Sequence, residues 1–594
     1  MKELILTGIK EFWPQDESNA IFLGPWCFAG NHKYKFWDQE NFKLAPSPWK
    51  SPHDIFKASL YIDSLIDRII PPLSKLMNNF HKIKYSDQFW EKYTIVWLTH
   101  WLGHCYDRYK RLEHVEKVAG EKLKVKMSSC HASNFWDYMK GVTEGHYPNL
   151  LLMSDIIRNG QFKFLNTEEF NVPDYANDRK CIEKYPRTAI DYVLGKLNRF
   201  ARSVKRNLEN CMASSLYLGN IYGLSLIDKF YLQLSSDPLF IFKRKNNSNL
   251  LKIERDRNNF AGQILEFDVR NEFEEIIKTI VLSHIPNALL SIYSRQQNDK
   301  PRLKIWIGND IYKSEENAFR IAEICEHGGR WISAQHGGGY GQTLYFPIGK
   351  IEYETSDGFI TWGWDFKHIY SSHYYPLPSP MLSKLPKHKY KKEQIVFVST
   401  MHPPYFYRLQ STLLPEQQLE YLVNKKRFFL KLERNILLKI RYKSYIYDYG
   451  IEEVEFVSTV LLQDQFLVKC KLTREFKNSK LVVINHMATS FLEAFVMNVP
   501  TILFWNPEHF ATTPEATPYF DKLRATGILF DHPGAAAEKV NEIWGDVQGW
   551  WQQPEVQKAK DEFCYQFART SKNWRKEWVE LLKGFIKNKG VDNS

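Results

Sequence analysis

The amino-acid sequence predicts an α/β protein whose two halves each carry a parallel sheet and face one another across a cleft. The first indication is length, because 594 residues exceed what one ordinary hydrophobic core accommodates. The second is a regular alternation of short apolar runs with helical patterns from residue 301 onward. The third is a proline-rich stretch at 371–394, which interrupts that alternation and divides it into two blocks.

The N-terminal half is expected to begin with two short strands and to continue with extra long helices. Pro71 and Pro72 are expected to break the first long helix. His100 and His104 lie one turn apart on the second, but no third ligand follows, so packing or hydrogen bonding is favoured over metal binding. The elements expected before residue 300 are strands at 3–8 and 20–26, helices at 54–83, 87–118, most of 134–235 and 271–295, and a solvated loop at 245–260.

Beyond residue 300 the elements alternate as in a parallel α/β fold. The tail from Pro554 is predicted to be helical, with an apolar stripe from Trp574 to Phe585 that is expected to pack back onto the first domain. The expected strands lie at 303–307, 330–334, 359–362, 395–399, 481–485, 501–505 and 527–530, and the expected helices at 314–326, 415–442, 490–498, 516–525 and 534–545.

Composition narrows the class of partner and the compartment. The net charge of +12 suits an anionic partner, whereas no zinc-finger spacing, RNA-binding signature or concentrated basic arm indicates nucleic acid. Eight scattered cysteines without a close pair are typical of reduced thiols in a cytosolic protein. The apolar part of the N-terminus is too short for a signal peptide, and no run approaches the roughly 18 apolar residues of a membrane span. We expect a cytoplasmic protein whose contact with a membrane would be peripheral and from the cytosolic surface.

The stretch 480–507, KLVVINHMATSFLEAFVMNVPTILFWNP, predicts a strand, a polar turn, a short helix and a second strand. Ligands of such parallel units lie beyond the carboxyl ends of the strands, often with an anion at a helix N-terminus. We therefore expect the hydroxyl groups of Thr489 and Ser490 to meet a phosphate. Glu493, one turn further, is expected to receive sugar or ribose hydroxyls. The alternative for Thr489 and Ser490 is ordinary helix capping.

A second candidate site follows the expected strand at 330–334 and reads QHGGGYG. Successive glycines let the backbone come close to a ligand and adopt positive φ angles. His336, just past the strand end, can serve as a general base for an acceptor hydroxyl. The alternative is a tight turn whose histidine only forms a hydrogen bond. The loop residues of interest are Gln335, His336, Gly337, Gly338, Gly339 and Tyr340.

A third candidate, His402-Pro403-Pro404, follows the expected strand at 395–399. An imidazole there can donate to a phosphate oxygen while Pro403 stiffens the loop; the alternative is an ordinary loop. His402 and the Thr489–Ser490 pair follow neighbouring strands of one domain, so both could reach the same phosphate. His336 would face them from the other domain. A donor site in one half and an acceptor base in the other is the arrangement of a two-domain transferase.

Five segments carry a resemblance to known proteins. They are LGPWC at 23–27, WLGHCYDRY at 101–109, QHGGGYG at 335–341, TWGW at 361–364 and FLEAFVMNVPTILFWNP at 491–507. These segments resemble a family of transferases found in bacterial O-antigen loci, and the layout resembles a GT-B glycosyltransferase, with two Rossmann-like domains facing across a cleft. The resemblance implies transfer of a sugar from a nucleotide donor to a glycan or lipid-linked glycan acceptor during surface polysaccharide synthesis.

The domains expected on this basis are an N-terminal acceptor-side domain at 1–375 with helical insertions, a linker at 376–394, a C-terminal nucleotide-donor domain at 395–553 and a returning helical segment at 554–594. No Asp-x-Asp pair of the kind that holds a metal in GT-A enzymes occurs. A metal-independent reaction without a cofactor is therefore expected, with the nucleotide sugar as substrate. Leaving-group charge would be stabilised by His402, the hydroxyl groups of Thr489 and Ser490 and the helix N-terminus.

Two further resemblances bear on the donor. A His-Pro with a Ser/Thr pair resembles the CMP-binding pattern of bacterial sialyltransferases and Kdo transferases, which implies that His402, Pro403, Thr489 and Ser490 hold a CMP-activated nonulosonic or Kdo-type sugar. The same segments resemble CDP-glycerol-using teichoic acid polymerases, except that Asn485 stands where those proteins tend to have Asp. Asn485 also replaces the first Glu of the Glu-x7-Glu pattern of UDP- and GDP-sugar enzymes, of which Glu493 is the second. Those donors, and a non-catalytic GT-B-fold binding protein, are the alternatives.

Overall fold

The structure is a computed structural model of the 594-residue chain. It describes every residue except 32, 129–141, 144, 171–211, 214, 238–240, 243–250, 254–259, 261, 291, 295–302, 347, 367–369, 371, 407, 411, 469 and 588–594. Much of the predicted helical region at 134–235, and most of the predicted loop at 245–260, therefore lie outside the described residues.

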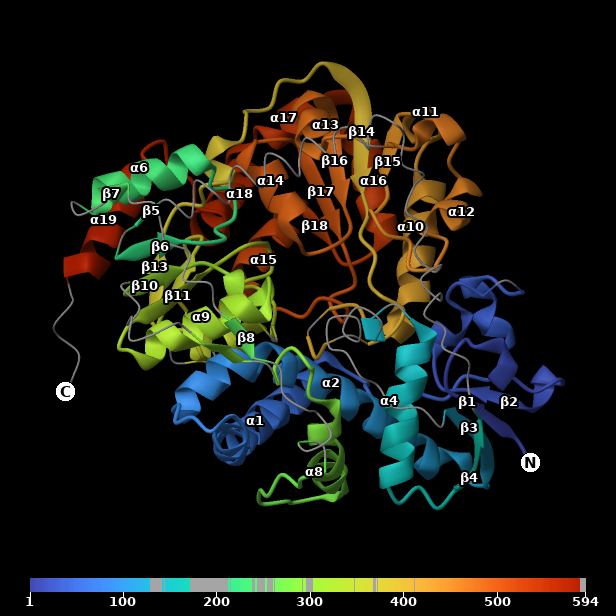
Figure 1. Ribbon diagram of the computed structural model, residues 1–594. Helices are drawn as coiled ribbons and strands as arrows, with labels where there is room; N and C mark the ends of the chain where they lie inside the picture. The colour runs from blue at the N-terminus through green and yellow to red at the C-terminus, as the bar shows by residue number, and fades with distance from the viewer. Residues whose placement is uncertain are drawn as a thin grey trace, which may run out of the picture.

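Within the described residues, three parallel sheets organise the molecule (Figure 1). Their orders are β2-β1-β3-β4, β13-β12-β11-β10-β6 and β15-β14-β16-β17-β18, with neighbouring strands parallel. The predicted α/β class with parallel sheets is confirmed. The N-terminal half, however, holds two of these sheets where one was expected. Its first sheet was not recognised because two long helices separate β2 from β3, which hides the alternation.

We call the parts of the chain around these sheets the N-terminal, middle and C-terminal units. The N-terminal unit contains β1 (Glu3–Ile5), β2 (Ala20–Phe22), β3 (Leu123–Ser128), β4 (Leu165–Phe170), α1 (Pro52–His81), α2 (Asp87–Ala119), α4 (His146–Asn159) and α8 (Glu272–His284). The prediction that α1 breaks at Pro71 and Pro72 is wrong, since both lie inside one helix. The neighbouring Ile69, Ile70 and Leu73 are buried, and their packing outweighs the missing backbone donors.

The middle unit has helices on a five-stranded sheet. It contains β6 (Leu216–Leu218), β10 (Ile305–Ile307), β11 (Arg330–Ala334), β12 (Phe359–Thr361), β13 (Tyr374–Pro376), α6 (Leu226–Ser236) and α9 (Glu315–Glu326), and short pairs form from β5 (Met212–Ala213) with β7 (Ile241–Phe242) and from β8 (Leu251–Ile253) with β9 (Ile292–Ser294). Ser314 caps α9 as predicted. Strand β13 lies near the start of the proline-rich stretch at 371–394, which predicts a linker. Pro376 is tolerated there because β13 is an edge strand.

The C-terminal unit follows the predicted alternation closely. It contains β14 (Lys392–Val398), β15 (Ile440–Lys443), β16 (Ser479–Ile484), β17 (Thr501–Phe504), β18 (Leu529–Phe530), α10 (Gln418–Lys431), α11 (Arg434–Leu437), α12 (Glu453–Ser458), α13 (Leu472–Asn478), α14 (Thr489–Val496), α15 (Thr517–Ala525), α16 (Pro533–Ile543), α17 (Val547–Trp551) and α18 (Pro554–Phe567). The expected helix at 415–442 is wrong at its end. Its last residues form edge strand β15, because Ile440 and Tyr442 alternate into the core.

The last helix, α19 (Trp574–Lys587), leaves the C-terminal unit and packs on the middle unit against α6 (Figure 1). Trp574, Trp578 and Phe585 are buried there with Leu216 and Leu218 of β6. The apolar stripe at the end of the chain therefore packs on protein. A helix of the last segment thus crosses to the preceding sheet and ties the two units together.

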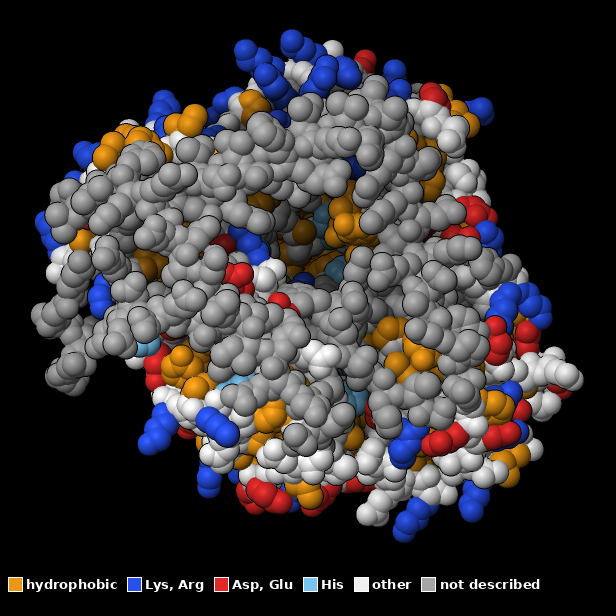
Figure 2. Space-filling view, in the orientation of Figure 1, with side chains coloured by type: hydrophobic (Ala, Val, Ile, Leu, Met, Phe, Trp, Pro, Cys, Tyr) orange, Lys and Arg blue, Asp and Glu red, His pale blue; other side chains and the backbone are white. Residues whose placement is uncertain are grey.

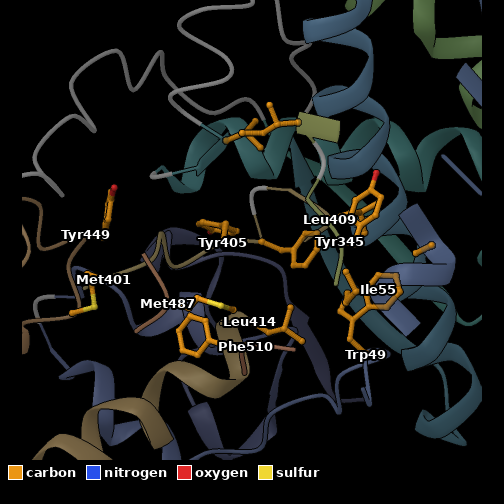
Figure 3. Packing of buried hydrophobic residues seen from close by; sticks show 14 of the residues in the cluster. Trp49, Ile55, Tyr345, Met401, Tyr405, Leu409, Leu414, Tyr449, Met487 and Phe510 are labelled. Atoms are coloured by element: carbon orange, nitrogen blue, oxygen red, sulfur yellow. The ribbon is translucent and has the colours of Figure 1, made fainter. Parts of the chain in front are cut away.

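Buried residues of all three units form one hydrophobic cluster. Figure 3 shows Tyr405 and Leu409, which follow β14, among Trp49 of the N-terminal unit and Tyr345 of the middle unit. The Tyr405 hydroxyl lies 2.7 Å from Nδ1 of His146 in α4. The segment after β14 is thus held where the three units meet, and it is the segment that carries His402.

Candidate functional site

The glycine loop at 335–341 leaves the carboxyl end of β11 and is anchored from beneath by Gln335. The side-chain oxygen of Gln335 accepts hydrogen bonds of 2.9 Å from the Trp362 amide and from the Trp364 indole. Its side-chain nitrogen donates to the Gly337 carbonyl at 2.9 Å. Gln335 is buried, so these bonds make it part of the scaffold of the loop. Gly339 has φ 87°, a left-handed conformation that favours glycine.

The loop directly touches the N-terminus of α14. The Gly338 amide donates a hydrogen bond of 2.8 Å to the hydroxyl oxygen of Thr489. A Cβ on Gly338 would lie 2.5 Å from the carbonyl carbon of Ala488 and 2.7 Å from the Thr489 nitrogen, so the approach requires glycine. Ala488 is the N-cap of α14, and no side chain caps this helix. The capping alternative is therefore wrong, because Thr489 and Ser490 are the first two helical residues.

Further bonds extend this contact between the middle and C-terminal units. The Leu344 amide donates to the Ala511 carbonyl at 2.9 Å, and the Thr513 amide donates to the Gln342 carbonyl at 2.9 Å. We call the contact of 338–344 with 488–489 and 511–513 the seam. It fixes the orientation of the glycine loop toward the carboxyl end of the C-terminal sheet.

His336 lies over a buried carboxyl group. The Tyr340 hydroxyl is 2.9 Å from Nδ1 of His336 and donates to Oε2 of Glu352 at 3.1 Å. Oε1 of Glu352 is 3.6 Å from the same Nδ1 and accepts from the Asn309 amide at 3.0 Å. The Glu352 side chain is 0% exposed and that of His336 is 32% exposed. Part of the imidazole thus stays accessible while Tyr340 and Glu352 fix its orientation.

Burial sets the protonation of this pair. Desolvation lowers the pKa of His336 to about 4, and the cation Arg408 acts in the same direction. Desolvation raises the pKa of Glu352 to about 8, although hydrogen bonds from Asn309 and Tyr340 oppose the shift. Near pH 7 His336 is therefore a neutral imidazole, the form that can accept a proton.

A further histidine, His486, links the predicted donor-binding segments. Its Nε2 lies 3.1 Å from Oγ of Ser490. Burial, followed by the charge of His402, lowers the pKa of His486 to about 3. The pKa of His402 falls to about 3, mainly through burial and then through the charges of Arg408 and Lys425. His402 and Ser490 therefore share His486 as a neighbour.

Asn485 is buried next to His486, and one end of its side-chain amide is hydrogen-bonded. Its Oδ1 accepts a hydrogen bond of 2.7 Å from the Tyr421 hydroxyl of α10. Its Nδ2 has no hydrogen-bond partner within the described residues. Buried amide donors are nearly always bonded. The Asn485 side chain is therefore a candidate donor of a hydrogen bond to a ligand.

Arg408 is a cation that all three units share. Its charge contributes to lowering the pKa of His336 in the middle unit, of His402 in the C-terminal unit and of His100 on α2. Coulomb interactions weaken with distance, so these histidines converge on one guanidinium. Lys425, the other cation near His402, pairs with buried Glu453. Arg408 is thus the cation that histidines of all three units have in common.

Glu493 lies one turn into α14 and faces the middle unit. Burial raises its pKa to about 7. The pKa of Tyr222, in the turn after β6, is raised by burial and then by the charge of Glu493. Tyr222 stacks on Trp362 with ring centres 6.0 Å apart. The carboxyl group of Glu493 therefore meets an aromatic surface of the opposite unit.

Two hollows flank these residues. One lies beside His402, Pro403 and Arg408 and has an empty volume of ≈ 230 Å³. The other, of ≈ 430 Å³, lies at the seam between Thr513 and a set of aromatic rings that includes Phe346. Figure 2 shows a hollow at the centre of the molecule where histidine and apolar side chains gather.

The sequence matches the LIC12162 family of transferases over residues 2–582. The chain belongs to this family. No curated protein matches the sequence. Among solved structures, the chain is similar to MurG of Acinetobacter baumannii, with 11% sequence identity and a TM-score of 0.26 over 48% of this chain and 74% of that one. This likeness is too distant to support an argument.

In this LIC12162 family transferase, the predicted site residues gather along the seam, and some of them are buried supports of the loops. His336, Thr489, Ser490 and His402 converge, and Glu493 faces the middle unit, to which His336 belongs. Gln335 and Tyr340 are buried supports, as described above. The Pro403 carbonyl accepts a hydrogen bond of 2.8 Å from Gln418, which fixes the His402 loop.

Sequence reasoning missed Glu352, Arg408 and His486. His486 is the second residue after the end of an apolar strand, as His336 is, and that position could have identified it. Glu352 and Arg408 lie in segments without a regular pattern, so no local signal distinguished them.

Within the described part of the chain, no group of three or more His, Cys, Asp or Glu side chains could hold a metal ion. No helix in that same part is long and apolar enough to cross a membrane.

Proposed function

We propose that this transferase moves a sugar from a nucleotide donor to a glycan acceptor in the synthesis of a bacterial surface polysaccharide, such as O-antigen or capsule. The supporting observation is the 2.8 Å hydrogen bond from Gly338 to Thr489. It joins the loop of a neutral imidazole, His336, to a helix N-terminus that no side chain caps. A base and an anion site on opposite sides of one seam suit the two substrates of a group transfer.

In the proposed reaction, His336 removes the proton of an acceptor hydroxyl as that oxygen attacks the anomeric carbon of the donor. The bond from the anomeric carbon to the phosphate oxygen breaks, and the nucleotide leaves with the bonding electrons. The charge that develops on the phosphate is stabilised by Arg408, by the N–H groups of the first turn of α14 and by a hydrogen bond from His402. The Thr489 hydroxyl accepts from Gly338 and keeps its own proton to donate.

We propose a CMP-activated nonulosonic or Kdo-type sugar as the donor. Support comes from the neighbourhood of His402, His486 and Ser490, where imidazole and hydroxyl groups could surround a single phosphate. Asn485, with its unbonded Nδ2, and Glu493 would bind donor hydroxyls or carbonyl groups. A CDP-glycerol donor is the alternative, followed by UDP- and GDP-sugars.

The cation of Arg408 offers the charge that a metal would otherwise supply, so we propose a metal-independent reaction. A chelator is then expected to leave the transfer rate unchanged, and metal-dependent turnover would contradict this part of the proposal.

We also propose that the protein acts in the cytoplasm, with peripheral contact at the cytoplasmic face of the inner membrane. The acceptor would be a glycan or a lipid-linked glycan.

The test combines ligand binding with turnover. CMP, CDP, UDP and GDP are compared in thermal-shift measurements, because only a ligand that binds the folded protein raises its Tm. We expect the largest rise with CMP, and transfer from a CMP-sugar that His336→Gln abolishes without loss of the CMP-induced rise. A larger rise with CDP favours the CDP-glycerol alternative. A rise without donor hydrolysis or transfer would indicate a non-catalytic binding protein and contradict the proposal.

A further inference from the structure

Helix α6 turns an apolar stripe toward solvent. Ile227 is 79% exposed, Tyr231 is 46% exposed and Leu234 is 54% exposed, and Phe230 between them is 37% exposed. These residues stand at i, i+3, i+4 and i+7, the spacing of one helix face. In a helix that covers a sheet, this face normally points inward. Here it points outward, and Figure 2 shows hydrophobic side chains gathered at the upper left, over α6, with Lys and Arg beside them.

The opposite face of α6 is polar and buried, and specific bonds hold it there. Asp228 is 1% exposed and accepts hydrogen bonds from Arg575 at 2.7 and 2.9 Å. The Gln233 side chain donates to the Leu216 carbonyl of β6 at 3.0 Å. Ser225 caps the helix by accepting from the Asp228 amide. These bonds, together with the burial of Leu232 in the core, fix the orientation of α6.

Basic side chains lie next to the stripe. Helix α19 packs on α6, and its exposed cations are Arg575, Lys576, Lys583 and Lys587, against the exposed acid Glu580. Lys384 and Arg575 pair with Asp228 on the buried face of α6, so the cations left for an anionic surface are Lys576, Lys583 and Lys587. An apolar stripe beside cations complements a lipid bilayer, whose acyl chains are apolar and whose headgroups can be anionic.

The stripe is continuous with the candidate site. The turn that leads from β6 into α6 carries Tyr222, which is 38% exposed and stacks on Trp362. The charge of Glu493 contributes to the pKa of Tyr222, so this turn faces α14. A ligand that lies along α6 would therefore come close to Glu493 in α14, the helix whose first residue forms part of the seam.

We propose that α6 docks the protein on an anionic phospholipid bilayer, with the stripe of Ile227, Phe230, Tyr231 and Leu234 between the headgroups and acyl chains. Helix α6 has 11 residues, too few to span a membrane, so it lies in the plane of the interface. Helix α6 would be the surface that makes the peripheral membrane contact proposed above. This role does not depend on which nucleotide donor is used. Docking would present Tyr222 and the seam to a lipid-linked acceptor.

The experiment measures co-sedimentation of the full-length protein with two kinds of vesicle. One is phosphatidylethanolamine with phosphatidylglycerol, and the other is phosphatidylcholine alone. Replacing Ile227→Ser together with Leu234→Ser removes two exposed apolar side chains without touching the buried face of α6. Replacing Leu430→Ser together with Leu462→Ser is the matched control, because those side chains are 64% and 57% exposed on the C-terminal unit.

We expect the wild-type protein and the control to bind the anionic vesicles, and the α6 double variant to bind at least about tenfold more weakly. Lys576→Glu with Lys583→Glu is expected to weaken binding to the anionic vesicles and to leave binding to phosphatidylcholine unchanged. Hydrogen exchange should slow in α6, and not in α10, when vesicles are present.

Equal binding by the α6 variant and the control would overturn the proposal, as would a wild-type protein that ignores both vesicles. A dimer in solution that only the α6 variant loses would also overturn it and assign the stripe to a second copy of the chain. Transfer to a soluble acceptor should be the same in the α6 variant and the wild type. Loss of vesicle binding is thereby separated from failure of the proposed reaction.

Discussion

The backbone amide of Gly338 and the hydroxyl group of Thr489 are 151 residues apart in sequence and 2.8 Å apart in space. This bond connects a loop of the middle unit to the first residue of α14 in the C-terminal unit. A base and a phosphate site that belong to different units are useful only when their separation is fixed. The geometry of the proposed reaction therefore depends on this contact.

Gly338→Ala should uncouple the two sides of the seam. The added Cβ would lie 2.5 to 2.8 Å from backbone atoms of Ala488 and Thr489, so the loop must move. We expect transfer to fall about a hundredfold, the effect of a displacement near 1 Å in a reacting pair. Gly337→Ala is the matched control, since its Cβ would lie 3.5 Å from Thr489 Oγ1, an ordinary contact. Similar rates for the two variants would show that the approach of Gly338 is unimportant for catalysis.

His336 should titrate well below an ordinary histidine. Its pKa of about 4 reflects desolvation above all; a hydrogen bond with the Ala334 backbone opposes the shift, and the charge of Arg408 adds to it. In NMR spectra of labelled protein, the signal that is missing in His336→Gln should remain that of a neutral imidazole down to about pH 4. Arg408→Gln should raise this pKa, because the nearby cation no longer opposes protonation. A His336 that titrates near pH 6.5 in the wild type would contradict the proposed environment.

Glu352 should make the protein less stable as pH rises. Its pKa is near 4.5 in the unfolded chain and about 8 in the folded protein, so the folded state holds the proton across that range. Stability therefore falls between about pH 4.5 and 8, by at most about 5 kcal/mol. Glu352→Gln keeps the shape of the side chain and lacks this titration. The measurement is the free energy of unfolding of both proteins at pH 5 and pH 8.

The wild type should lose more stability than Glu352→Gln over that interval. Asp63 and Glu493, whose pKa values are raised to about 7, affect both proteins alike and cancel in the comparison. The variant should also have a lower kcat with little change in KM, because Glu352 orients His336 without touching the substrate. Parallel pH profiles of stability would show that the carboxyl group is ionised in the fold.

Glu493 should make donor binding depend on pH. Its pKa is raised to about 7 by burial, and an ionised carboxylate is the stronger acceptor for sugar hydroxyls. Donor affinity should therefore rise as pH increases through 7, and fall about tenfold for each pH step of one below it. Calorimetric titrations at several pH values measure this. Glu493→Gln should give a flat profile, whereas Tyr222→Phe, which keeps the facing ring, should keep the slope. A slope in Glu493→Gln would assign the titration to another group.

The sequence predicted the C-terminal unit almost strand by strand, because each buried strand there is a short apolar run bounded by polar turns. The same reasoning placed His336 and His402 shortly after strand ends and Ser490 at the start of a helix, since such positions can be identified from local pattern. This reasoning failed where the local sequence pattern gives no signal. Glu352 lies in a short helical segment without periodicity, and only folding brings its carboxylate to 3.6 Å from Nδ1 of His336.

The outward stripe of α6 is the sharpest such case. The sequence around Ile227 and Leu234 gives an amphipathic helix, and any rule of burial would turn that face inward. Asp228 decides otherwise, because Arg575, more than 300 residues away, and Ser225 satisfy its charge in the interior. A long-range ion pair of this kind leaves no trace in local composition.

The sequence by itself determined the α/β class, the order of the C-terminal strands and the polar groups at their ends, because those follow from periodicity over a few residues. The tertiary structure alone decided that the N-terminal half holds two sheets, that Gly338 meets Thr489 and that Arg408 lies within reach of histidines from three units. These relationships join residues far apart in the chain. They depend on how packed units dock, which local patterns do not encode.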